Sequence, residues 1–223
     1  MVWVHIIAVH GVYDMAWTYA TLTSAIQNWT ENDATEFTSI IDDIIALAEL
    51  RILKEVDLTI SRKETTTSIT SGANVAAVPS DIIVPRWIRI QNGAYLLPKD
   101  ESFMREYSPT SSTSGAPRYY AWSGDGATNF IISPYANATT TLEVGYTYRI
   151  TGLSSGNTTN WLGTNAPDVL LYACLLEAAL FEKQEQQELQ KITMMYERAL
   201  QTLAKEEQEK RRTDNYRAGE QRL

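Results

Sequence analysis

Apolar residues recur with a helical period in the first part of the chain. Spacings of three and four residues predict a short amphipathic helix with apolar positions at Leu22, Ala25, Ile26 and Trp29. Asp33 and Glu36 then have the spacing of a capping box. The apolar positions that follow predict one long helix with a single buried face, formed by Phe37, Ile40, Ile41, Ile44, Ala48 and Ile52.

A second helical region is predicted from about residue 164. Thr164 and Asn165 are candidate caps, Pro167 suits the first turn, and Asp168 complements the helix N-terminus. Residues 169–181 are apolar almost all round, which indicates burial on several sides. Beyond them, apolar positions with heptad-like spacing predict a helix that packs against another helix; they are Leu189, Ile192, Tyr196, Ala199 and Leu203.

The region between these helices has no helical period and is rich in Thr, Ser, Gly, Tyr and Ile. Residues 82–90, Asn92-Gly93 and residues 95–97 predict a hairpin with a type I′ turn. Residues 118–122 and 129–133 predict a second hairpin, and residues 108–116 a loop. The alternation in residues 140–151 predicts a half-buried strand.

The chain is therefore predicted to be α+β: a bundle of three to four helices, including a long C-terminal helix, with a small inserted β module and an extended C-terminal tail. The predicted boundaries are an N-terminal extension at 1–20, helical parts at 21–56 and 164–209, the β module at 57–163 and the tail at 210–223.

Charge and composition exclude several classes of protein. The 19 basic and 27 acidic residues give a net charge of −8. No basic stripe for gripping a phosphate backbone is visible, and an acidic surface suits a component that DNA passes without sticking. The longest apolar run, residues 169–181, contains Glu177 and is shorter than the roughly 20 residues of a membrane-spanning helix. Residues 1–14 lack the cationic region of a signal peptide, so we expect neither a membrane segment nor secretion.

The residues that carry catalysis are scarce. Cys174 is the only cysteine and there are two histidines, which excludes a disulfide framework, a multi-cysteine or His-rich metal site and most nucleophile–histidine pairs. Cys174 lies in the most apolar segment and is expected to act as a small hydrophobic residue. Asp42 and Asp43 are expected on a solvated helix edge, and Asp125 in a turn. We therefore predict no enzyme activity, cofactor or metal.

Two alternatives remain open for the β module. Its many aromatic residues could form a glycan- or receptor-binding face, although strands and protein interfaces also favour aromatic residues. A hydrolase that uses Asp125 or Glu143 is the other alternative. Met194 and Met195 are interpreted as packing or interface residues.

Residues 161–181, WLGTNAPDVLLYACLLEAALF, followed by a long polar helix and a charged tail, resemble the head-to-tail adaptor, or connector, proteins of short-tailed bacteriophages. Ile26, Trp29, Phe37 and Leu50-Arg51 extend the resemblance toward the N-terminus. The residues of the motif are Trp161, Asn165, Pro167, Asp168, Leu171 and Tyr172.

The resemblance implies a virion protein at the head–tail junction, made in the host cytoplasm. Such adaptors form a ring of about twelve copies that joins the capsid portal to tail, nozzle or fibre proteins, and double-stranded DNA passes through it without specific binding. They bind no cofactor and no membrane. Their C-terminal segments dock on the portal, which makes the basic tail the expected portal interface, with Arg211, Arg212, Tyr216, Arg217, Arg222 and Leu223 as its candidate residues.

Overall fold

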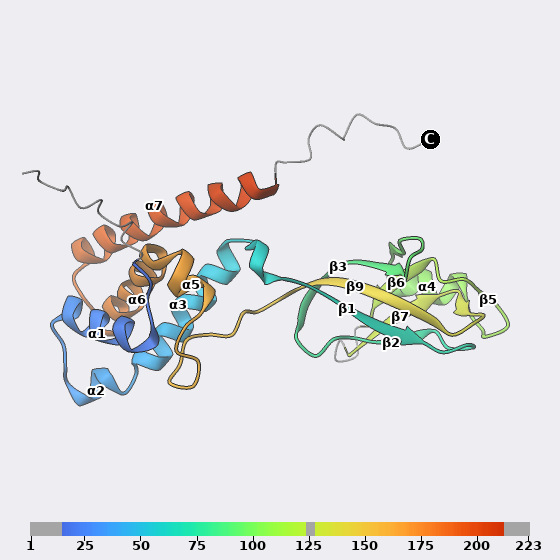
Figure 1. Cartoon of the computed structure of the whole chain (residues 1–223), viewed down its shortest axis with the longest axis horizontal. Helices are drawn as coiled ribbons and strands as arrows, with labels where there is room; N and C mark the ends of the chain where they lie inside the picture. The colour runs from blue at the N-terminus through green and yellow to red at the C-terminus, as the bar shows by residue number, and fades with distance from the viewer. Residues whose placement is uncertain (1–14, 124–127, 212–223) are drawn as a thin grey trace, which may run out of the picture. The chain divides into compact units, whose positions relative to one another are not determined.

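The structure, a computed structural model, describes residues 15–123 and 128–211 of the chain (Figure 1). They form two units. Residues 59–149 form a β unit, and the described residues before and after them form a helical unit. Helices and several small sheets are both present, which confirms the α+β class. Residues 150–163, which we predicted to lie in the β module, belong to the helical unit, because Leu153 and Leu162 are buried in its core.

The helical unit is built around one buried helix, α6 (Pro167–Phe181). It contacts α1 (Tyr19–Thr30), α3 (Ile41–Glu55), the short α5 (Trp161–Asn165) and the long α7 (Gln186–Arg211). Nine of its 15 residues are buried, which confirms the prediction that this apolar segment is covered on several sides. On α7 the heptad-like positions Tyr196, Ala199 and Leu203 are buried, and Leu189 and Ile192 pack against the same core.

The N-terminal boundary differs from the prediction. Thr18 caps α1 and forms a reciprocal capping box with Thr21, so the helix begins at Tyr19. Trp17 packs against the helical core, and its indole Nε1 donates a hydrogen bond of 2.9 Å to the Pro167 carbonyl. Residues 17–20 are therefore part of the helical unit. Trp29 is 61% exposed and does not share the buried face of Leu22 and Ile26.

The long helix predicted from Asp33 is wrong, because it is interrupted. A short α2 (Thr35–Thr38) precedes α3, and Ile40 between them departs from helical geometry. The hydroxyls of Thr38 and Ser39 donate to the carbonyls of Thr35 and Glu36, and such side-chain bonds compete with helix continuation. The predicted capping box does not form, since Ala34 is the N-cap residue of α2 and makes no side-chain bond.

The predicted caps of the second helical part are also wrong. Asn160 caps α5 by accepting a hydrogen bond from the Gly163 N–H at 2.9 Å, whereas Asn165 donates its side-chain amide to the Trp161 carbonyl. Pro167 is the first residue of α6, as predicted. The backbone N–H at this position has no partner within a helix, so its absence in proline costs no hydrogen bond. At the other end, α7 continues to Arg211, so the helix ends two residues later than the predicted 209.

The described residues of the β unit form three small sheets. Strand β9 (Thr140–Tyr148) is central in the first, between β1 (Arg62–Ile69) and β3 (Ile82–Ile90). The buried alternation of Leu142, Val144 and Tyr146 confirms the predicted half-buried strand, which ends at Tyr148 rather than at residue 151. The second sheet has four strands, in the order β2 (Val75–Ala77), β7 (Asn129–Ser133), β6 (Tyr119–Trp122) and β4 (Leu97–Pro98). The third sheet pairs β5 (Ser114–Gly115) with β8 (Tyr135–Ala136).

The hairpin of residues 118–133 is confirmed, because β6 (Tyr119–Trp122) pairs antiparallel with β7 (Asn129–Ser133). The first hairpin is only partly correct. The chain turns after β3 with Asn92 at φ 56°, but Gly93 is not left-handed, so the turn is not type I′. After one bridge between Arg89 and Tyr95, the chain leaves this sheet, and β4 (Leu97–Pro98) pairs in parallel with β6.

The helix of the β unit was not predicted, and neither were the short strands β2, β5 and β8, of which β5 lies within the predicted loop of residues 108–116. The seven-residue helix α4 (Glu101–Tyr107) packs on β6 and β7, at one end of the sheet that also contains β2 (Val75–Ala77). A helix of two turns shows too few periodic positions to stand out in the sequence.

Candidate assembly interface

The last turn of α7 is held against α5. The Lys210 ammonium lies 5.5 Å from the centroid of the Trp161 ring, within cation–π range, and it forms an ion pair of 2.5 Å with Glu207. The Glu207 side chain is buried. The last turn of α7 is therefore packed against Trp161 of α5. Of the predicted portal residues, Arg211 is the last residue of α7, whereas Arg212, Tyr216, Arg217, Arg222 and Leu223 lie outside the described residues.

The motif residues do not form one site. Leu171 is buried in the helical core, Trp161 contacts Lys210, and Pro167 accepts the bond from Trp17. Asp168 and Tyr172 instead face a groove of about 370 Å³ between α6 and α7. The α7 side of this groove is formed by Met195, Arg198, Ala199 and Thr202.

Exposed methionines mark the outer surface of α7. Met194 and Met195 are 62% and 49% exposed. Met195 faces the α6–α7 groove, and Met194 faces a second hollow of about 320 Å³ formed by residues of α7 alone, among them Leu189 and Thr193. Methionine adapts its shape to a partner and is common at binding surfaces. Of the two sequence interpretations, this exposure favours the interface.

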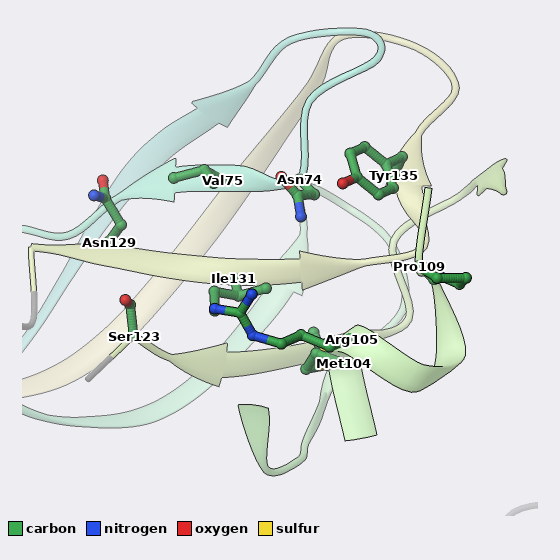
Figure 2. A pocket seen from close by; sticks show the side chains of 10 residues that line it. Asn74, Val75, Met104, Arg105, Pro109, Ser123, Asn129, Ile131 and Tyr135 are labelled. Atoms are coloured by element: carbon green, nitrogen blue, oxygen red, sulfur yellow. The ribbon is translucent and has the colours of Figure 1, made fainter. Parts of the chain in front are cut away.

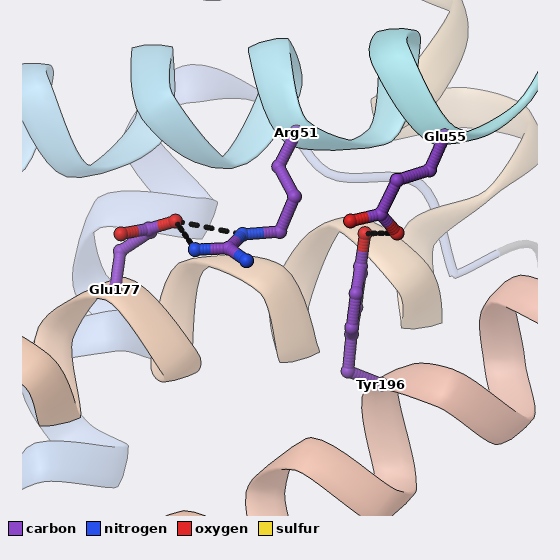
Figure 3. A network of polar contacts seen from close by, with 4 residues as sticks. All are labelled: Arg51, Glu55, Glu177 and Tyr196. Carbon is purple, nitrogen blue, oxygen red and sulfur yellow. Dashed lines mark hydrogen bonds and ion pairs between the residues drawn. The ribbon is translucent and has the colours of Figure 1, made fainter.

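Two polar contacts fix α3 against α6 and α7 (Figure 3). Arg51 of α3 donates from Nε and Nη2 to Glu177 of α6, at 2.8 and 2.5 Å. Glu55, one turn further along α3, accepts a hydrogen bond of 2.8 Å from the hydroxyl of Tyr196 on α7. Burial, and then the nearby Glu55 carboxylate, raise the pKa of Tyr196, so the phenol keeps its proton and donates. These contacts hold the three helices in register beneath the α7 surface.

A buried carboxyl group ties the segment after the β unit to α3. Glu49 is 4% exposed and accepts hydrogen bonds from the Leu153 N–H, at 3.1 and 3.2 Å to its two oxygens, and from the Asn160 amide at 2.6 Å. Gly152 leaves room for the carboxylate, because a Cβ there would lie 2.5 Å from Glu49 Oε2. Burial raises the pKa of Glu49, and the bonds from Leu153 and Asn160 partly oppose that rise.

The raised pKa of Glu49 predicts a pH dependence of stability. Because the folded state binds this proton more tightly than the unfolded state, the contribution is complete below the ordinary value of 4.5 and is lost as the pH rises through the raised pKa. We expect Glu49→Gln to remove this part of the pH dependence, measured as free energies of unfolding in denaturant from pH 4 to 7. The exposed Glu36→Gln variant should keep it. Parallel curves for wild type and Glu49→Gln would contradict the assignment.

Three residues considered for catalysis are buried or bound to another side chain. Cys174 is fully buried, and burial raises its pKa well above the usual range, so no reactive thiolate is available. Asp42 accepts a hydrogen bond from the Tyr19 hydroxyl, and Glu143 is ion-paired with Arg89. Asp125 lies outside the described residues. Within residues 15–123 and 128–211, no group of three or more His, Cys, Asp or Glu residues could hold a metal ion.

The described helices include none that is both long enough and apolar enough to cross a lipid bilayer. A comparison with curated proteins finds no match for this chain. The family model described as SU10 adaptor protein matches residues 17–222. That match begins at Trp17, the first residue fixed to the helical core, and it covers all described residues of both units except Met15 and Ala16. The chain therefore belongs to the SU10 adaptor protein family of phage adaptors, which are structural components of the virion.

Proposed function

We propose that this adaptor is the connector of a short-tailed phage: a non-enzymatic ring protein that joins the capsid portal to the tail or nozzle. About twelve copies form the ring, and double-stranded DNA passes through it without specific binding. The tail after α7 docks on the portal, and the lower face of the ring carries the tail proteins.

The observation that carries this proposal is the fixed end of α7. The contact of Lys210 with Trp161 packs the last turn of α7 against α5, so each copy of the helical unit ends α7 in the same place. With Arg211, residues 212–223 carry four arginines and two acidic residues, and such a short charged segment can order on a partner of opposite charge.

Charge supports the proposed passage of DNA. Six exposed carboxylates lie on the first three helices and the turns between them, at Glu31, Asp33, Glu36, Asp42, Asp43 and Glu55. Only Arg51 and Lys54 oppose them between residues 15 and 58, and Arg51 is bound to Glu177. A surface of this kind repels phosphate groups, so DNA can slide past without being held.

Deletion of residues 211–223 is expected to abolish binding to the portal of the same phage while leaving both units folded. Native mass spectrometry of the purified portal ring mixed with the intact chain should show about twelve added copies, and none with the truncated chain. Circular dichroism of the truncated chain should match the intact one. Undiminished portal binding after truncation would contradict the docking role of the tail. An intact chain that never associates with the portal would contradict the connector function itself.

A further inference from the structure

A cleft in the β unit lies where α4 leaves one face of a sheet uncovered. In the antiparallel pairs β2–β7 and β6–β7, opposite residues share a face, so Val75, Ile131 and Ala121 lie on the same side. Further along this face, Met104 and Ser108 are buried, and the hydroxyl of Ser133 donates to that of Ser108 at 2.9 Å. Since α4 has only seven residues, it covers that end and stops short of Val75 and Ile131.

The uncovered part is a hollow of about 400 Å³, within the usual range for ligand pockets of roughly 300–1,000 Å³ (Figure 2). Its floor is aliphatic, formed by Val75 and Ile131. Its rim is polar: Asn74 and Tyr135 lie on one side, Asn129 on another, and Arg105 extends into it from α4. An apolar floor with a few convergent polar groups is typical of a small-molecule site.

Several of these polar groups have unused hydrogen-bonding capacity. Among the described residues, neither the Asn74 amide nor the Tyr135 hydroxyl makes a side-chain hydrogen bond. Asn129 makes one long bond of 3.3 Å, to Thr128. Arg105 donates Nε and Nη2 to Glu101, and its side chain is 75% exposed, so the second terminal nitrogen faces solvent. A ligand can therefore gain bonds here without displacing any that the protein makes to itself.

We infer that this cleft binds a saccharide with an acidic sugar residue. Sugar rings have an apolar C–H face, which fits the Val75–Ile131 floor, and a rim of hydroxyls. Each hydroxyl both donates and accepts, as do the two carboxamides and the phenol. The free Arg105 nitrogen selects a carboxylate on the sugar. One arginine that is already shared with Glu101 does not provide the basic surface that a nucleic acid backbone requires. This inference does not depend on the ring or on portal docking.

Calorimetric titration of the full chain with a galacturonic acid tetrasaccharide tests the site, with the matched neutral galactose tetrasaccharide as comparison. We expect a dissociation constant of about 1 mM or tighter for the acidic saccharide, and binding about tenfold weaker for the neutral one. Asn74→Ala should weaken both about tenfold, and Arg105→Gln should remove the preference for the acidic sugar. Arg118→Gln, an exposed arginine of the same unit outside the cleft, should change neither.

Three outcomes would overturn the inference. The first is that neither saccharide binds the wild-type chain. The second is that both bind, but with affinities that Asn74→Ala and Arg105→Gln leave unchanged. The third is that heptapeptides selected from a random library bind in a manner that depends on Asn74 and Arg105 while no saccharide binds, which would assign the cleft to a protein partner. Circular dichroism of each variant separates loss of binding from loss of folding.

Discussion

Replacement of Leu170 by alanine is expected to lower the free energy of unfolding of the helical unit by about 2–5 kcal/mol. Leu170 is fully buried in α6, the helix that the other helices of its unit surround. Removing the branched end of Leu170 loses the transfer free energy of the buried carbons. It also leaves a cavity that the neighbouring side chains cannot fill, because they pack on α6 from several sides. The loss is of the same order as the whole stability of many domains, about 5–15 kcal/mol.

Leu180→Ala provides the matched control, because Leu180 lies on the same helix and is 50% exposed. Its effect should stay within about 0.5 kcal/mol. Unfolding in guanidinium chloride, followed by far-UV circular dichroism, reports the helical unit, since most helical residues lie there. Equal losses for the two variants would show that α6 is not the buried centre of its unit.

Replacement of Gly163 by alanine is expected to destabilise the helical unit by about 2 kcal/mol. Two opposing effects decide the sign. Alanine is the better helix former by about 1 kcal/mol, which by itself would stabilise α5. A Cβ at this position, however, would lie 2.5 Å from the backbone oxygen of Trp17. Such overpacking costs about 1–3 kcal/mol, and moving Trp17 also strains two hydrogen bonds, from its backbone N–H to Gly163 at 2.7 Å and from its indole to Pro167.

Gly156→Ala is the matched glycine control, because a Cβ there would meet only the Ser154 hydroxyl, at 4.0 Å. The backbone of Gly156 is not left-handed, so alanine fits there without strain. The substitution should be neutral or stabilise by up to about 1 kcal/mol, because alanine lowers the conformational entropy of the unfolded chain. Denaturant midpoints of the two variants measure the difference. A stabilising Gly163→Ala would mean that the backbone of Trp17 does not approach α5 as the structure has it.

The sequence predicts the helical and β regions well because their signals are local. The alternation of Leu142, Val144 and Tyr146 and the heptad-like spacing on α7 depend on periods of two and of three to four residues, and both are borne out by burial. The predicted helix boundaries are less accurate. The helix is interrupted at Ile40, although the apolar pattern continues on both sides of that residue. The periodicity does not reveal that the hydroxyls of Thr38 and Ser39 donate hydrogen bonds to carbonyls three residues earlier.

Only part of the candidate surfaces could be predicted from the sequence. The motif around Trp161 and Asp168 indicated a phage adaptor, but the structure separates its residues among the core, the α6–α7 groove and the contact with Lys210. The cleft of the β unit had no sequence signal. It exists because the unpredicted helix α4 is too short to cover its sheet, and its polar groups come from separate segments around residues 74, 105, 129 and 135.

The sequence by itself determined the α+β class, the burial of α6 and the burial of Cys174 within it, because composition and short periods specify these properties. Tertiary structure alone decided which groups meet. Glu49 binds Leu153 across 104 residues, and Trp17 binds Pro167 across 150. Whether alanine at Gly163 stabilises or destabilises depends on such a contact. Local preferences act over a few residues, whereas close approach and desolvation depend on partners that only the folded chain brings together.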